Sequence, residues 1–169
     1  MFDKFGEFDS AEEINRAAAA QLAEGDTEAI YAIAKENGID VEEADDFIDG
    51  ITEELCTPLM AANGKLTVEA AELDIKGILI DWKNSVEQLC LDDEAIAKAV
   101  RQKGKSLLAC MAALIKFSFE NKVKVSSKIV SATKVLNHGK LEQLRGPLYL
   151  GVPNRAEAKR IITDYYMGR

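Results

Sequence analysis

The chain has 169 residues, which is enough for one domain, 1–169, with its own core. Of these residues 47% are hydrophobic and 30% are charged, a composition that excludes a disordered chain. Residues 1–94 hold 25 acidic and 6 basic residues, a formal charge of −19, whereas residues 95–169 hold 4 and 15, or +11. Such segregation favours binding over catalysis, because the two parts either neutralise each other within the fold or present a surface to a charged partner.

The N-terminal third predicts three short helices. Each starts at a side chain that can accept a hydrogen bond from the first turn, namely Ser10, Asp26 and Asp40. Ser10 and Glu13 form a capping box in which Glu13 reaches back to the Ser10 amide. Gly25 ends the first helix and Asn37-Gly38 the second, and the apolar positions of the third continue to Ile51.

Two longer helices follow. One runs from Thr67 to about Cys90, with apolar residues from Ile75 onward at spacings of three and four, which form one stripe. The other runs from Glu94 to Glu120, with Gly104 as a bend. The stripe faces either the protein's own core or a twin subunit, and periodicity is the same in both cases.

The last segment mixes extended and helical signals. Residues 122–125 alternate with period two, and residues 129–136 predict a short helix. Glycine and proline bracket residues 146–153, which predicts a short strand or extended loop, and a final helix starts at Asn154 with Glu157 in the capping-box position. The predicted fold is mainly α, a single compact domain of six to eight helices with a small β or extended element near residues 148–152.

No catalytic or metal signature emerges from the sequence. Cys56, Cys90 and Cys110 are widely spaced among apolar neighbours, which predicts buried reduced thiols. A zinc site would need close pairs of soft ligands, whereas these cysteines lie 34 and 20 residues apart and His138, the single histidine, lies in a polar stretch. Gly104-Lys105-Ser106 lacks the earlier glycine of a phosphate-binding loop. We therefore expect no enzyme, no cofactor and no metal. The longest apolar stretch is too short for a bilayer, so we also expect a cytoplasmic protein that does not enter a membrane.

The densest charge lies between Asp40 and Glu54, where eight acidic residues occur and no base. A crowded, solvated run argues against the split pKa values of a catalytic pair. These carboxylates either form a solvated face that the basic half partly balances, or they occupy a groove that another protein has built for phosphates. The candidate partner-binding face consists of Glu42, Glu43, Asp45, Asp46, Asp49 and Glu53.

Basic residues cluster in the second half, with Lys122, Lys124 and Lys128 between two denser groups. They suggest nucleic-acid binding as an alternative, although a sequence pI of about 4.8 opposes it. The candidate nucleic-acid-binding residues are Lys98, Arg101, Lys103, Lys105, Arg155, Lys159 and Arg160.

Phe2, Phe5 and Phe8 repeat at a spacing of three. They either anchor the protein in a partner's pocket or fold back over the first helices and close the core.

The opening MFDKFGEFDSAEEINRAAAAQLAEGD and the close RGPLYLGVPNRAEAKRIITDYYMG resemble small proteins of prophages and conjugative elements of gut Clostridia. Cas9-inhibiting anti-CRISPR proteins have come from this pool. The resemblance covers the two ends and implies a protein of a mobile genetic element acting inside a bacterial host cell. We therefore expect a binding protein that inhibits a host nucleic-acid-handling enzyme such as a Cas9 nuclease. The alternative is a nucleic-acid-binding accessory protein of a phage or conjugative element.

Overall fold

The computed structural model describes residues 7–168, and every structural statement below concerns these residues. Helices dominate, and the four short strands lie near the C-terminus, which confirms the mainly α prediction; the nine described helices exceed the expected six to eight. The helices are α1 (Ala11–Glu24), α2 (Thr27–Glu36), α3 (Val41–Ile48), α4 (Pro58–Glu72), α5 (Ile78–Asp92), α6 (Glu94–Arg101), α7 (Leu107–Glu120), α8 (Ser127–Ala132) and α9 (Arg155–Met167). The strands are β1 (Val123–Lys124), β2 (Lys134–Asn137), β3 (Lys140–Gln143) and β4 (Tyr149–Leu150).

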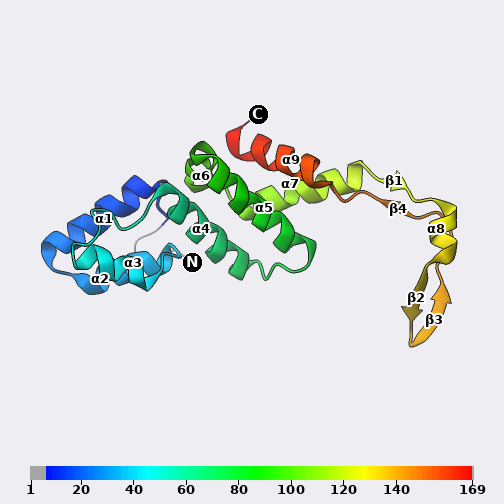
Figure 1. Cartoon of the computed structure of the whole chain (residues 1–169), viewed down its shortest axis with the longest axis horizontal. Coiled ribbons are helices and arrows are strands. Elements are labelled where there is room, and N and C mark those ends of the chain that lie inside the picture. The colour runs from blue at the N-terminus through cyan, green and yellow to red at the C-terminus, as the bar shows by residue number, and fades with distance from the viewer. Residues whose placement is uncertain (1–6, 169) are drawn as a thin grey trace.

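Two hydrophobic cores lie side by side along the molecule (Figure 1). Residues 7–57, here called the N-terminal lobe, build the first core from the apolar faces of α1, α2 and α3. Helices α4 to α7 and α9, here called the helical body, build the second around Trp82, Leu107 and Ile162. Helix α4 joins the two, because Ala61 belongs to the first core and Leu66 to the second.

Local capping signals locate the starts of α1, α2, α3 and α9 correctly, but α4 begins at Pro58 after a cap by Thr57, whereas the sequence placed this helix start at Thr67. The Ser10 hydroxyl accepts a hydrogen bond from the Glu13 amide at 3.2 Å, but the Glu13 carboxylate accepts from the Asp9 amide at 2.9 Å, one residue before the predicted position. The capping box of Asn154 and Glu157 forms as expected at the start of α9. Asp40 precedes α3 without a side-chain cap hydrogen bond.

Four predicted elements differ from the structure. The long helix at 67–90 is two helices, because Asp74 and Gly77 take positive φ angles of 44° and 58° that no α-helix continues through. Gly104, with φ 79°, likewise separates α6 from α7 instead of bending one helix. Helix α3 ends at Ile48, short of Ile51. The helix expected at 129–136 ends at Ala132, and β2 follows it.

The turn that ends α2 and helix α4 approach each other backbone to backbone. The turn at Asn37 and Gly38 lies directly against Gly64 in α4. A Cβ atom on Gly64 would lie 2.1 Å from the Asn37 carbonyl oxygen, and one on Gly38 would lie 2.5 Å from the Gly64 carbonyl oxygen. Both glycines are therefore required by this crossing, and Gly38 also has a φ of 66°.

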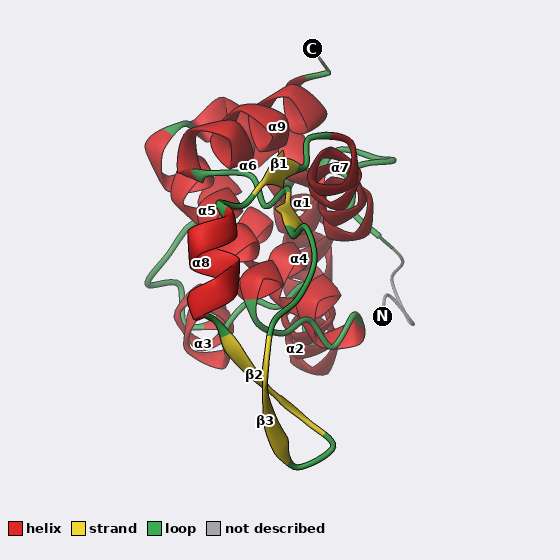
Figure 2. Ribbon diagram, turned by 90° about the vertical axis from the view of Figure 1, so that its right-hand side faces the viewer, coloured by secondary structure: helices red, strands yellow, loops and turns green. Residues whose placement is uncertain are grey.

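Residues 122–152, here called the arm, project from the helical body (Figures 1 and 2). At the base of the arm β1 pairs antiparallel with β4, and the Val125 amide donates to the Leu148 carbonyl oxygen at 2.8 Å. Helix α8 and the β2–β3 hairpin lie beyond this base. Within the arm only Val130 is buried. The returning chain is seated tightly, because a Cβ atom on Gly151 would lie 1.9 Å from the Ser118 carbonyl oxygen.

Candidate partner-binding surfaces

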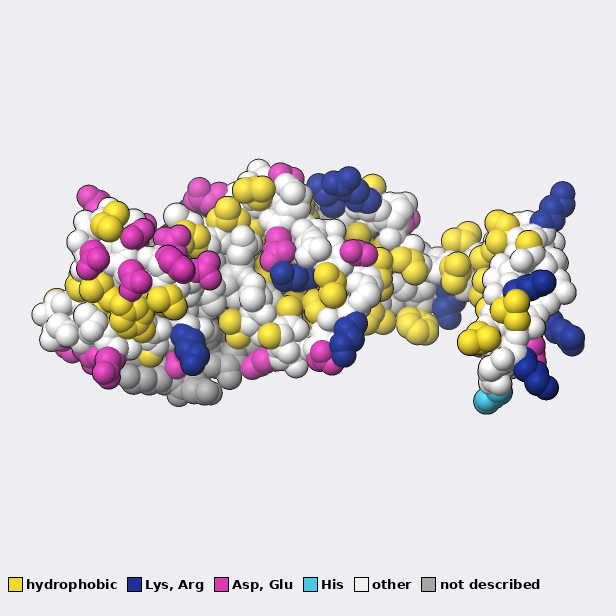
Figure 3. Space-filling model, turned by 60° about the horizontal axis from the view of Figure 1, so that its bottom comes forward, with side chains coloured by type: hydrophobic (Ala, Val, Ile, Leu, Met, Phe, Trp, Pro, Cys, Tyr) yellow, Lys and Arg dark blue, Asp and Glu magenta, His cyan; other side chains and the backbone are white. Residues whose placement is uncertain are grey.

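The N-terminal lobe is strongly negative. Residues 7–57 contain 16 acidic and 2 basic residues, a formal charge of −14. Figure 3 shows carboxylates spread over this end of the molecule, with few cations among them. The segregation of charge along the sequence is therefore also a segregation in space.

The acidic face lies on α3 and the turn that follows it. Glu42, Asp45, Asp49 and Glu53 are exposed, and Glu43 and Asp46 are half-buried. Within residues 7–168 no cation forms an ion pair with any of the six carboxylates. Tyr31 is a neutral neighbour: its hydroxyl donates to Asp45 Oδ1 at 2.5 Å, and this hydrogen bond raises the pKa of Tyr31. The negative charge of the face is thus not balanced by the fold.

A groove of about 370 Å³ runs beside this face. Leu55, Cys56 and Met60 give it an apolar floor, and Glu43 and Glu53 stand at its edge. The exposed side chains of Val41 and Ile51 lie on the same part of the lobe, 59% and 70% accessible. Figure 3 shows hydrophobic side chains gathered among carboxylates at this end of the molecule. The lobe therefore offers apolar contact area as well as negative charge.

Arg101, one of the candidate nucleic-acid contacts, is a buried structural residue with 1% of its surface exposed. Its Nη2 donates to Asn37 Oδ1 at 2.7 Å and to the Phe8 carbonyl oxygen at 2.8 Å. Burial lowers the pKa of its guanidinium, since removal from water disfavours the charged form. Arg101 cannot contact a phosphate from this position, so the sequence assignment of this residue to a binding surface is wrong.

Further buried polar groups extend this contact into an inner polar layer between the two cores. The Lys65 ammonium is fully buried and donates to Glu7 Oε1 at 2.6 Å and to the Lys105 carbonyl oxygen at 2.8 Å. Glu69 accepts from the Leu107 amide at 2.7 Å, and burial raises the pKa of its carboxyl group. Phe8 packs on the first core, whereas Phe2 and Phe5 lie outside the described residues. The layer joins the N-terminal lobe to the helical body.

The remaining candidate cations do not form one surface. Most of them are held by the protein itself: Lys105 Nζ donates to the Tyr165 carbonyl oxygen at 2.6 Å, and Lys98 pairs with Glu94 at 2.6 Å. Lys159 lies 3.8 Å from Asp92, and Arg160 lies 3.6 Å from Asp164. Lys103 and Arg155 are exposed.

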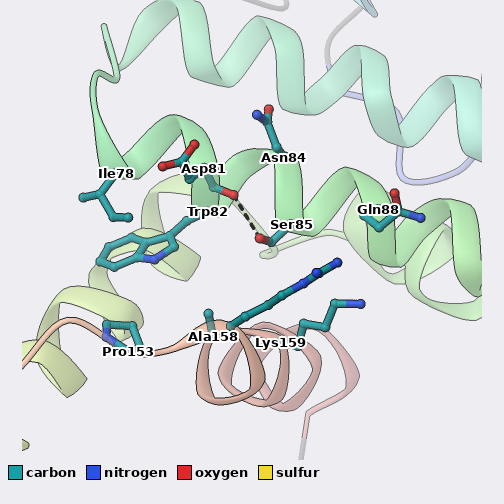
Figure 4. Close-up of a pocket in the computed structure, with 10 residues that line it drawn as sticks. Ile78, Asp81, Trp82, Asn84, Ser85, Gln88, Pro153, Ala158 and Lys159 are labelled. Carbon is teal, nitrogen blue, oxygen red and sulfur yellow. Dashed lines mark hydrogen bonds between the residues drawn. The ribbon is translucent and has the colours of Figure 1, made fainter.

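A groove of about 410 Å³ separates α5 from α9 (Figure 4). Trp82, Pro153 and Ala158 line it with apolar surface, and Asp81 and Lys159 add charge. The Ser85 hydroxyl donates to the Asp81 carbonyl oxygen at 2.9 Å, within its own helix. The residues that line the groove include no histidine or cysteine, and the Ser85 hydroxyl is bonded to its own helix.

The three cysteines are buried thiols, as the sequence predicted. Desolvation raises the pKa of Cys56, Cys90 and Cys110 to about 12 each, which keeps them protonated and unreactive. His138 is exposed at the turn of the β2–β3 hairpin. Among the described residues no group of three histidine, cysteine or acidic side chains is arranged to hold a metal ion.

The arm carries a cluster of cations that the sequence interpretation did not assemble. Its formal charge is +5, from six basic residues and one acid, Glu142. All six cations are exposed and none forms an ion pair within residues 7–168. They are Lys122, Lys124, Lys128, Lys134, Lys140 and Arg145. The ratio of bases to acids over residues 122–152 was the available signal, but only the structure shows that this segment leaves the body.

Comparisons with known proteins assign no family. No family model, curated protein or solved structure matches the chain. The resemblance of the two ends to proteins of clostridial mobile elements therefore stays a prediction. Within residues 7–168 no helix has the length and apolar character needed to cross a membrane.

Proposed function

We propose that this protein is a non-catalytic binding protein that inhibits a nucleic-acid-handling enzyme of a bacterial host, with a Cas9-type nuclease as the first candidate. The observation that supports this proposal is the acidic face, whose six carboxylates have no ion-pair partner within residues 7–168. The net charge of −14 on the N-terminal lobe adds a field that attracts basic surfaces. The resemblance to proteins of mobile elements supplies the biological setting.

The mechanism follows from the placement of the carboxylates. Glu42, Asp45 and Asp49 are three and four residues apart, so they share one side of α3 and its C-cap over about 10 Å of helix length. A nuclease channel that binds nucleic acid is lined with lysine and arginine, and a row of carboxylates competes for it with phosphates. The apolar groove beside α3 supplies contact that phosphates cannot give.

Charge reversal tests this proposal. A variant with Glu42→Lys, Asp45→Lys and Asp49→Lys should associate more slowly with the nuclease and with a flatter salt dependence, because steering by the acidic face is lost. Its matched control is Asp81→Lys, Asp92→Lys and Glu120→Lys, which changes the net charge equally at exposed positions outside the lobe. We would measure inhibition of DNA cleavage, and binding kinetics at salt concentrations from about 50 to about 300 mM. Contacts between exposed charges are progressively screened over this range. Equal inhibition by the two variants would contradict the acidic-face mechanism.

A second candidate function is nucleic-acid binding, and the six exposed cations of the arm, none of which forms an ion pair within residues 7–168, favour it. Three of them, Lys134, Lys140 and Arg145, lie on or beside the hairpin, away from the negative lobe. If all three contact phosphates, changing them to glutamine should reduce the slope of log K against log salt by about 2.7, from roughly 0.9 per contact. Gel shifts with DNA and RNA measure this, and a double change of Lys103 and Arg155 in the helical body is the control.

A further inference from the structure

The aliphatic side chains of the arm serve neither function proposed above. Many of them are exposed to water. A two-stranded hairpin on its own is only marginally stable in water, so further contacts to these side chains would stabilise it. Exposed apolar patches on folded proteins commonly mark sites of protein contact. The exposed aliphatic residues of the arm are Val123, Ile129, Val135, Leu136, Leu141, Leu150 and Val152.

The hairpin combines these aliphatic groups with positive charge. Leu136 and Leu141 lie opposite each other across the two strands, 74% and 65% exposed. Lys134 lies two residues from Leu136 in the same strand, so both side chains project from the same face. Val135 shares the opposite face with Lys140. Glu142 lies opposite Val135 and offsets Lys140 on that face, so the face of Lys134, Leu136 and Leu141 is the one that fits a partner surface that is both apolar and negatively charged.

The N-terminal lobe of this chain has that chemistry. Its groove has an apolar floor at Leu55 and Met60 and carboxylates at Glu43, Glu53 and Glu54. The lobe has a formal charge of −14 and the arm a formal charge of +5. The arm thus finds opposite charge and matching apolar contact on the same protein.

The arm and the lobe of one copy lie at opposite ends of the long axis of the molecule, so they cannot meet within the chain (Figure 1). Two copies placed side by side in antiparallel orientation bring each arm to the lobe of the other. Such a pair has a two-fold axis, uses the same contact twice and closes without leaving a free arm or lobe. We propose that the arm docks into the acidic groove of a second copy of this chain, giving a reciprocal antiparallel dimer.

This dimer limits access to the acidic face. The groove that receives the arm lies beside α3, and Glu43 and Glu53 belong both to the groove and to the face. A second copy therefore competes with any basic partner for the same carboxylates. High salt and low protein concentration should favour the monomer, because the contact depends on opposite charges and on mass action.

The test begins with the oligomeric state of the full chain, measured by sedimentation equilibrium at 100 and 500 mM salt, between which the Debye length falls from about 10 Å to about 4 Å. The wild-type protein should be dimeric at the lower salt and shift toward monomer at the higher. An arm variant, Leu136→Ser with Leu141→Ser, and a lobe variant, Glu53→Lys with Glu54→Lys, should each be monomeric. All four side chains are exposed, and unchanged circular dichroism checks that both variants fold.

Mixing the two variants distinguishes a reciprocal dimer from other assemblies. The arm variant keeps an intact lobe and the lobe variant an intact arm, so a mixture retains one of the two contacts and should form a heterodimer weaker than the wild-type dimer. A monomeric wild type at 100 mM salt, a dimer that survives the arm substitutions, or a mixture that stays monomeric overturns the proposal. If the wild type is monomeric and changing Lys134, Lys140 and Arg145 to glutamine abolishes binding to DNA or RNA, the arm is instead a nucleic-acid contact. Inhibition of a nuclease is a separate readout, so its failure does not affect this result.

Discussion

The crossing of α2 and α4 gives the sharpest stability prediction, for Gly64→Ala. The new methyl group would lie 2.1 Å from the Asn37 carbonyl oxygen, whereas real Cβ contacts essentially never fall under 3.0 Å. The turn must therefore move by roughly 1 Å, and overpacking of this kind costs about 1–3 kcal/mol. The shift also strains the 2.7 Å hydrogen bond from Arg101 to Asn37, one of a class that contributes about 1.5–3 kcal/mol. Alanine regains about 1 kcal/mol of helix propensity, so the expected net loss is about 1.5–5 kcal/mol.

Urea unfolding followed by circular dichroism and by the fluorescence of Trp82, the single tryptophan, measures this loss. Gly25→Ala is the control, because a Cβ atom there meets nothing within 4 Å and only the positive φ of 75° opposes it, at about 1–2 kcal/mol. The changes in free energy of unfolding caused by Gly64→Ala and Arg101→Met should be non-additive by more than about 0.5 kcal/mol, because both substitutions disturb the same contact. The changes caused by Gly25→Ala and Arg101→Met should be additive. A Gly64→Ala protein more stable than wild type would mean that helix propensity dominates and that the close approach is wrong.

Four further outcomes are expected. The three cysteines should resist thiol reagents at pH 8 in the native protein and react in urea, because burial raises the pKa of each to about 12. Glu69→Gln should change the pH dependence of stability. Because the pKa of Glu69 is raised in the folded protein, its contribution to stability is present below the unfolded pKa and is lost as the pH rises through the folded pKa. The free energy of unfolding of the wild type should therefore fall relative to that of the variant as the pH rises above about 4.3. Asn154→Ala should cost about 1 kcal/mol in the same urea assay, through loss of the α9 cap. Gly151→Ala should speed amide exchange in the arm without unfolding the body, since its Cβ would collide with the Ser118 carbonyl oxygen.

The sequence correctly predicted helix ends that depend on residues close together in the chain. Caps such as Ser10 and Asn154 and the helix end at Gly25 depend on interactions within one turn of backbone, so the residue types at these positions predict them. The break at Asp74–Gly77 was missed because Ile75 still packs on the second core and keeps the apolar spacing intact. A side-chain pattern reports which residues are buried and does not report that the backbone between them has left the helix.

The candidate surfaces likewise differ in whether their residues are close together in the sequence. The acidic face could be predicted because its residues are close in sequence and lie on a single helix and its following turn. Arg101 could not be assigned correctly, because its acceptors on Asn37 and Phe8 are 64 and 93 residues away and only tertiary packing brings them together. The arm was missed for a related reason: its cations are spread over residues 122–152, and their common exposure follows from the projection of the segment away from the body.

The fate of the cations also decides between the two interpretations of charge segregation. Neutralisation within the fold would require cations of the basic half to pair with the acidic face, but no cation of residues 95–168 does so, and the arm lies at the far end of the molecule. The described ion pairs between residues 1–94 and 95–169, Lys98 with Glu94 and Lys159 with Asp92, lie on the helical body. The carboxylates of α3 and the lysines of the arm are therefore both left facing water. Two unbalanced surfaces of opposite sign at opposite ends favour a molecule that associates through its ends, and the salt dependence of its association is the property on which both proposals can be judged.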